Sequence, residues 1–178
     1  YEGDWVQDQK HGRGIFYLLN NNRYDGEWVE NTRQGQGTMY YHTGDVYEGN
    51  WMENKRQGKG TYTWKNGSSY TGNWVEDKKE GEGTFIWNDG TEYNGHWSNN
   101  VRSGKGTFKY ANGDKYVGDW KNDVQHGKGI YYFQTGDRYE GAYVDGKRTG
   151  EGVSNFVNGD KYIGHYKDGV EDGQGTFT

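Results

Sequence analysis

Aromatic and polar residues alternate along short segments of this chain, with the two-residue period of a β-strand. Residues 47–52 read ring, polar, glycine, polar, ring, and residues 58–64 alternate in the same way. A polar stretch, residues 53–57, separates the two segments, and no part of the chain shows a helical period. Each pair of segments therefore predicts a β-hairpin.

The hairpin pattern recurs every 23 residues without insertion or deletion. Repeats start at residues 1, 24, 47, 70, 93, 116, 139 and 162, and the last one is incomplete. Between repeats lie turn signals such as Asn66-Gly67 and Asn112-Gly113, which suit tight turns that need positive φ. We expect residues 1–178 to form one all-β rod: an elongated, twisted, single antiparallel sheet built as a meander of eight hairpin repeats.

Alternation also assigns the two faces of the sheet. The Tyr-x-Gly-x-Trp columns share one face, where rings can lie over glycines of a neighbouring strand because no Cβ blocks them. A single sheet has no second layer, so we expect this face to stay partly exposed and to form a groove for partner proteins. The expected lining residues of this groove are Tyr47, Trp51, Tyr62, Trp64, Tyr70, Trp74, Phe85, Trp87, Tyr93 and Trp97.

Composition narrows the class of protein. Hydrophobic residues make up only 29% of the chain but aromatic residues 17%, a combination that disordered chains lack. The absence of cysteine excludes disulfides and thiolate metal sites and favours an intracellular, cytoplasmic setting. A net charge of −5 disfavours nucleic acid as a partner. Because the chain starts inside a motif and without Met, we expect it to be a fragment of a longer protein.

The full pattern resembles the MORN (membrane occupation and recognition nexus) repeat. Its clearest copy runs from Tyr93-Asn-Gly-His-Trp97 through Gly104-Lys-Gly-Thr-Phe108 to Asn112-Gly-Asp-Lys-Tyr116. The resemblance covers the whole chain and implies a scaffold or docking module. Chains made only of such repeats resemble the cytoskeletal scaffold of apicomplexan and trypanosome cells, at the basal complex. For that scaffold the family implies dimerisation through the C-terminal repeats and partners from the cytoskeleton.

The last two repeats depart from the pattern. Tyr143 and Tyr166 replace the Trp column, and Ser154 stands where other repeats have Phe, Tyr or Met. Either these repeats are a solvent-tolerant cap, or they form a surface for a second copy of the chain. We favour a homodimer, with an interface formed by Tyr143, Ser154, Phe156, Tyr162, Tyr166 and Phe177.

Basic residues in the hairpin loops suggest an alternative function. They form a ridge that could bind anionic phospholipid at the membrane periphery. The ridge consists of Lys55, Arg56, Lys59, Lys78, Lys79, Arg102 and Lys105. Acids in the same loops, such as Glu76 and Asp77, weaken this alternative within a Debye length of roughly 8 Å.

Catalysis has little support in the sequence. The Gly-x-Gly pairs recur at a fixed period inside strands and open no helix, unlike phosphate-binding loops. The histidines are too far apart on a rod to converge on one ion, so no cofactor or metal is expected within the chain. A zinc ion shared between chains, through a His and a carboxylate such as Asp172, is the remaining alternative. We therefore expect a non-catalytic scaffold that self-associates and docks cytoskeletal proteins.

Overall fold

The computed structural model describes all 178 residues, which form strands and turns only. It divides into two units, residues 1–88 and 89–178, with eight strands in each. In the first unit the strands are β1 (Glu2–Val6), β2 (Gln9–Tyr17), β3 (Arg23–Val29), β4 (Thr32–Tyr40), β5 (Val46–Met52), β6 (Lys55–Thr63), β7 (Ser69–Val75) and β8 (Lys78–Ile86). In the second they are β9 (Glu92–Ser98), β10 (Val101–Lys109), β11 (Lys115–Lys121), β12 (Val124–Tyr132), β13 (Arg138–Val144), β14 (Lys147–Asn155), β15 (Lys161–Lys167) and β16 (Val170–Phe177).

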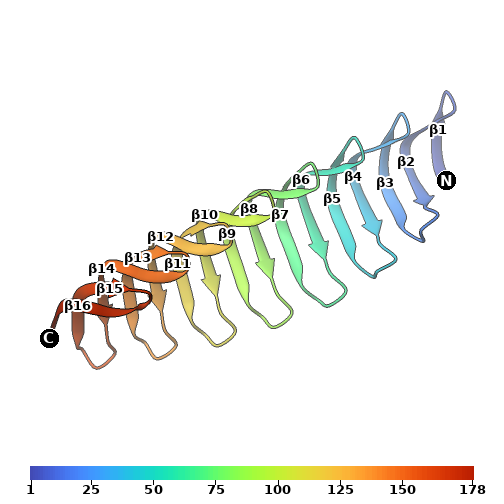
Figure 1. Cartoon of the computed structure of the whole chain (residues 1–178). Helices are drawn as coiled ribbons and strands as arrows, with labels where there is room; N and C mark the ends of the chain where they lie inside the picture. The colour runs from blue at the N-terminus through green and yellow to red at the C-terminus, as the bar shows by residue number, and fades with distance from the viewer. The chain divides into compact units, whose positions relative to one another are not determined.

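Within each unit, every strand pairs antiparallel with its neighbours in the chain, and the strands follow sequence order (Figure 1). Odd-numbered strands carry the Tyr-x-Gly-x-Trp segments and even-numbered strands carry the Gly-x-Gly segments. The predicted fold class is confirmed: the chain is all-β and antiparallel, an open meander with two strands in each 23-residue repeat.

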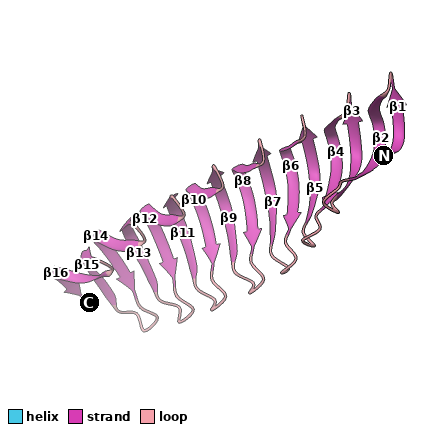
Figure 2. Cartoon of the chain, turned by 45° about the vertical axis from the view of Figure 1, so that its right-hand side comes forward, coloured by secondary structure: helices cyan, strands magenta, loops and turns pink.

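A bulge bends each hairpin near its loop. In the third repeat Gly49 pairs with Gly60, but Trp51 pairs with Arg56, so three residues of β6 face one residue of β5. The middle one of the three, Gly58, has a φ of 71°, in the left-handed region that glycine adopts at little cost. Because of the bulge, the hairpin end curls away from the plane of the strands, as Figure 2 shows for successive pairs.

The core of each unit consists of the first-strand Tyr and Trp columns. Tyr47 is completely buried, and its hydroxyl donates to the Asn50 carbonyl (3.0 Å). The Trp51 Nε1 donates to the carbonyl of Gly37 in the previous repeat (3.0 Å). The Tyr47 ring lies against Gly60, where an added Cβ would collide with its hydroxyl. The predicted packing of rings over bare backbone is therefore confirmed.

Burial of these columns corrects one expectation from the sequence. We expected the whole aromatic face to stay partly exposed, but the bent hairpin ends supply cover that simple alternation does not reveal. Of the ten residues expected to line an exposed groove, six are buried in the core. They are Tyr47, Trp51, Tyr70, Trp74, Tyr93 and Trp97.

Candidate functional site

The rings that remain accessible form a zigzag in the first unit. Tyr62 and Phe85 come from the even-numbered strands, whereas Tyr41, Trp64 and Trp87 lie just beyond the ends of such strands. All five are half-buried. Successive ring centroids along this series are 5.7, 4.6, 5.0 and 4.4 Å apart. We call Tyr41, Tyr62, Trp64, Phe85 and Trp87 the first ring ladder.

The second unit has an equivalent series of rings. Phe108 contacts Tyr110, Tyr110 contacts Tyr131, and Tyr131 contacts Phe133, with centroids 4.6, 5.7 and 4.7 Å apart. We call these four residues the second ring ladder. Ser154 has no ring, so the series stops there. Phe156 and Phe177 then form a separate pair at 5.8 Å.

A row of cations from the bent hairpin ends lies beside the ladders. The Arg56 guanidinium is 5.4 Å from the Tyr62 ring and 4.4 Å from the Trp74 ring, distances typical of cation–π contacts. Asp77 of the next repeat holds it in place. The Asp77 carboxylate accepts from the Arg56 Nε (2.9 Å) and backbone N–H (3.0 Å), and its carbonyl accepts from the guanidinium (3.0 Å).

The same contact recurs between other neighbouring repeats. Asn54 accepts from the Arg33 backbone N–H (2.9 Å), and Asp123 accepts from that of Arg102 (2.8 Å). Each acceptor lies 21 residues after its arginine, with left-handed φ values of 68° at both Asn54 and Asp123. Asparagine and aspartate tolerate this conformation better than most residues, which explains their recurrence at this position.

A second series of hydrogen bonds joins repeats at the opposite ends of the strands. Asp114 accepts from the backbone N–H of Gln134 (2.8 Å) and from the Tyr131 hydroxyl (2.8 Å). The bond from Gln134 is the main cause that lowers the pKa of Asp114, against the opposing effect of desolvation. In the same way, Asp45 accepts from the backbone N–H of Lys65 and from the Tyr62 hydroxyl. One second-strand ring in each ladder, Tyr62 or Tyr131, is thus fixed by a turn residue of the preceding repeat.

The departures in the last repeats have a structural explanation. Tyr166 is buried, and its hydroxyl lies 2.8 Å from the Ser154 hydroxyl. The two substitutions compensate each other, because the small Ser154 leaves a partner and space for Tyr166. Tyr143 and Tyr162 are also buried. Four residues of the expected dimer interface thus lie inside their own chain, which contradicts their placement on an exposed surface, while Phe156 is half-buried and Phe177 is exposed.

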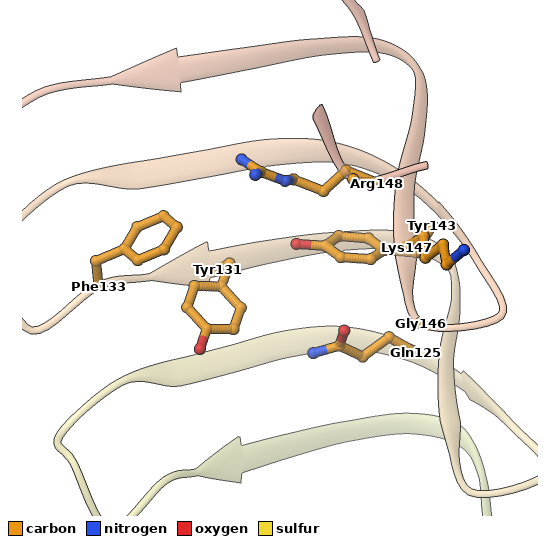
Figure 3. Close-up of a pocket in the computed structure, with 8 residues that line it drawn as sticks. Gln125, Tyr131, Phe133, Tyr143, Gly146, Lys147 and Arg148 are labelled. Carbon is orange, nitrogen blue, oxygen red and sulfur yellow. The ribbon is translucent and has the colours of Figure 1, made fainter. Parts of the chain in front are cut away.

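Tyr143, the first residue to replace the Trp column, borders a cavity of about 290 Å³ (Figure 3). Tyr143 lies between Arg148 and Gln125, and the rings of Tyr131 and Phe133 lie to one side. The other lining residues are Gln125, Gly146, Lys147, Arg148 and Gly169. Sequence reasoning missed this cavity, although the glycines at 146 and 169 mark it.

Most of the predicted basic ridge is engaged with neighbouring groups. Arg56 and Arg102 pair with Asp77 and Asp123 at 2.9 and 3.1 Å, and both side chains are mostly covered. Lys55 pairs with Glu76 (3.4 Å), and Lys105 pairs with Asp119. These contacts oppose the use of the ridge as a free cationic surface. The remaining predicted lysines are Lys59, Lys78 and Lys79.

The ladders also contain residues that the sequence analysis did not single out. Tyr41, Tyr110 and Phe133 belong to them, and all three occupy the eighteenth position of their repeats. That position is apolar from Leu18 onward, so the same column alignment could have found it.

Two further features bear on chemistry. The structure contains no group of three or more His, Cys, Asp or Glu side chains placed to hold a metal ion. No helix in it has the length and apolar character to cross a membrane.

Comparison with known proteins agrees with the repeat geometry. The model of the MORN repeat matches residues 1–23, 24–46, 47–69, 70–92, 93–115, 116–138, 139–161 and 162–178. The chain belongs to the MORN-repeat family. The predicted repeat boundaries coincide with the matched segments. Among curated proteins, no relative was found.

Two solved structures with a similar fold are domains of CPAP proteins. The TCP domain of Drosophila melanogaster SAS-4 (dCPAP), in complex with a proline-rich motif of Ana2 (dSTIL), matches with a TM-score of 0.55 and 18% identity, over 88% of this chain and 85% of that domain. The TCP10 domain of Danio rerio CPAP matches with a TM-score of 0.51 and 11% identity, over 86% of this chain and 73% of that one. At these identities the likeness concerns the fold alone.

Proposed function

We propose that this MORN-repeat chain is a non-catalytic docking scaffold whose first ring ladder binds extended, proline-rich segments of cytoskeletal proteins. The observation that carries the proposal is the unbroken series of half-buried rings from Tyr41 to Trp87. Proline-rich segments in the polyproline II conformation dock into aromatic-lined surfaces because little entropy is lost on binding. The proline-rich motif bound by the SAS-4 domain supports this choice of ligand.

The ladder has the features that such docking requires. Its Tyr62 ring is held by a hydrogen bond to Asp45 and a cation–π contact with Arg56, so this ring is ordered before a ligand arrives. The four predicted groove residues that remain half-buried, Tyr62, Trp64, Phe85 and Trp87, all belong to it. An intracellular, cytoskeletal setting forms part of the proposal.

The test uses fluorescence anisotropy with labelled proline-rich peptides and counterparts in which glycine replaces each proline. Wild type should bind the proline-rich peptides, and the Trp64→Ala, Trp87→Ala double variant should bind at least about tenfold more weakly, since buried aromatic anchors contribute roughly 2 kcal/mol or more. Ile86→Ala is the matched control, because Ile86 lies between Phe85 and Trp87 in sequence but is exposed on the other face. Equal binding of the glycine peptides, or full binding by the double variant, would refute the proposal.

Self-association is a second part of the proposed function. Phe156 and Phe177 support it, because they form a ring pair that is not enclosed by the core. Light scattering should give a mass that rises with concentration toward that of a dimer, and Phe177→Ser should reduce that rise. A constant monomer mass contradicts self-association without affecting the docking proposal. Salt-sensitive binding to vesicles of anionic phospholipid would instead favour the alternative function at the membrane periphery.

A further inference from the structure

The cavity in the second unit owes its shape to missing side chains. At the position where six repeats have asparagine or aspartate, the last two have Gly146 and Gly169. Both retain the left-handed backbone of that position, with φ values of 81° and 90°. No atom lies within 4 Å of where a Cβ would be at either glycine. The turn is therefore unchanged, and what is lost is the acceptor group.

Loss of that acceptor leaves one arginine without its usual partner. Gly169 lies 21 residues after Arg148, as Asp77 does after Arg56 and Asp123 after Arg102. The Gly169 backbone still donates to the Arg148 carbonyl (3.0 Å). The Arg148 guanidinium makes no ion pair or hydrogen bond and only lies over the rings of Tyr139 (5.1 Å) and Tyr166 (5.3 Å). Its planar set of N–H donors is thus free to bind a ligand.

A second group in the cavity is also without a partner. Tyr143 replaces a tryptophan whose Nε1 donates to a backbone carbonyl in earlier repeats, as in Trp51 and Trp74. Tyr143 is only 3% exposed, and its hydroxyl makes no hydrogen bond within the chain. Figure 3 shows the Tyr143 hydroxyl and the Arg148 guanidinium pointing the same way, toward the rings of Phe133 and Tyr131. The hydroxyl is not fully enclosed, because Arg23 Nε is the one buried side-chain polar atom without a partner. It faces the cavity, where a bound ligand could accept its hydrogen bond.

We infer that this cavity binds an oxyanion carried by a residue of a docked protein segment, either a carboxylate or a phosphate ester. The guanidinium of Arg148 provides paired donors that suit both groups, and the Tyr143 hydroxyl provides a third. No carboxylate is among the eight lining residues. Lys147 at the rim pairs with Asp168 (3.5 Å), so Arg148 is the lining cation without an ion pair. A volume of about 290 Å³ suits a single side chain rather than a larger cofactor. The inference rests on the proposed docking function for the nature of its ligand.

Three blocked tripeptides, Ala-X-Ala with X glutamate, phosphoserine or glutamine, test the inference on the full chain by NMR titration. A glutamate or phosphoserine peptide should bind at least about tenfold more tightly than the glutamine peptide, with shifts at Gly146, Arg148 and Gly169. Whichever acidic peptide binds more tightly identifies the natural group. The inference is overturned if glutamine binds equally well, or if inorganic phosphate binds more tightly than either peptide.

Gly169→Asp is the sharpest variant, because it gives Arg148 the carboxylate that Asp77 gives Arg56. Binding should fall at least tenfold while the thermal midpoint stays equal or rises. Tyr143→Phe should weaken binding several-fold, and Lys167→Gln, which removes an exposed charge in the last repeat, should have no effect. Unchanged peptide affinity in Gly169→Asp would overturn the inference. It would also be overturned if no peptide binds the wild type, but anionic vesicles bind it and Gly169→Asp abolishes that binding.

The two proposals can fail separately. The tripeptides need no contact with the first ring ladder, so the Trp64→Ala, Trp87→Ala variant should bind them with wild-type affinity. Tripeptide binding without proline-rich peptide binding would reject the docking ladder and retain the anion cavity. The reverse result would reject only the cavity.

Discussion

At the scale of single residues, a pair of glycines determines where each core tyrosine can lie. Gly49 and Gly60 face each other across β5 and β6, and the Tyr47 ring covers both. Neither glycine has a left-handed φ, so their role is to leave room rather than to permit an unusual backbone. Their recurrence in every repeat follows from the recurrence of the ring.

Gly60→Ala should lower the free energy of unfolding by about 1–3 kcal/mol, the usual cost of overpacking. The added Cβ would collide with the Tyr47 hydroxyl and ring. Urea unfolding followed by tryptophan fluorescence measures this change. Lys59→Ala, at the exposed neighbouring position, should change stability by less than about 0.5 kcal/mol. Equal stability of the two variants would mean that the ring can move aside.

At the scale of the hairpin, the loop side chain of one repeat determines whether the arginine of the preceding repeat has a hydrogen-bond acceptor. Asp77 binds the backbone and guanidinium of Arg56, whereas Gly169 leaves the side chain of Arg148 free. The same turn conformation thus occurs both with and without a side chain that accepts a hydrogen bond from the arginine.

Asp77→Gly should therefore cost about 1 kcal/mol, the value of a partly exposed hydrogen-bonded contact. Asp77→Asn should cost less than about 0.5 kcal/mol, because Asn54 already binds Arg33 in this way. Comparing the midpoints of thermal unfolding distinguishes the two. A loss of equal size in both variants would show that the charge matters rather than the acceptor.

Sequence columns predicted the strands, the turns and the ring-on-glycine packing, because each follows from alternation and local turn chemistry. They did not predict that Trp51 would be buried. Arg33 of the preceding hairpin lies over the Trp51 ring (4.6 Å), and its position depends on the bulge at Gly35, which changes register within that hairpin. The cavity was missed for a related reason: Arg148 and Gly169 are 21 residues apart, and only the folded pairing brings them together.

At the scale of the whole molecule, the buried tyrosines couple stability to alkaline pH. Burial raises the pKa of Tyr139 to about 12 from an ordinary value of 10, and it raises those of Tyr24, Tyr47, Tyr70 and Tyr116 as well. Above pH 10 the unfolded chain loses these protons while the folded chain retains them. The contribution to stability is complete below pH 10 and is lost as pH rises through the folded pKa values.

The thermal midpoint should therefore be insensitive to tyrosine ionisation up to about pH 9 and should fall steeply between pH 10 and 12. Circular dichroism melts at intervals across this range, with tyrosinate absorbance recorded in parallel, measure the effect. Tyrosinate should appear together with unfolding. Its appearance in a chain that remains folded would show that the hydroxyls are accessible to hydroxide.

Tryptophans such as Trp51 and Trp74 donate a hydrogen bond to the preceding repeat, which has a consequence for synthesis on the ribosome. Trp51 donates to Gly37, and Asn54 accepts from Arg33, so the second repeat gains its last contacts only when the third has emerged. The longest of these links spans 21 residues. Such short separations allow rapid closure, and domains generally fold as they leave the ribosome. Each newly made hairpin thus completes the one before it, and the nascent chain can fold in the order in which it is translated.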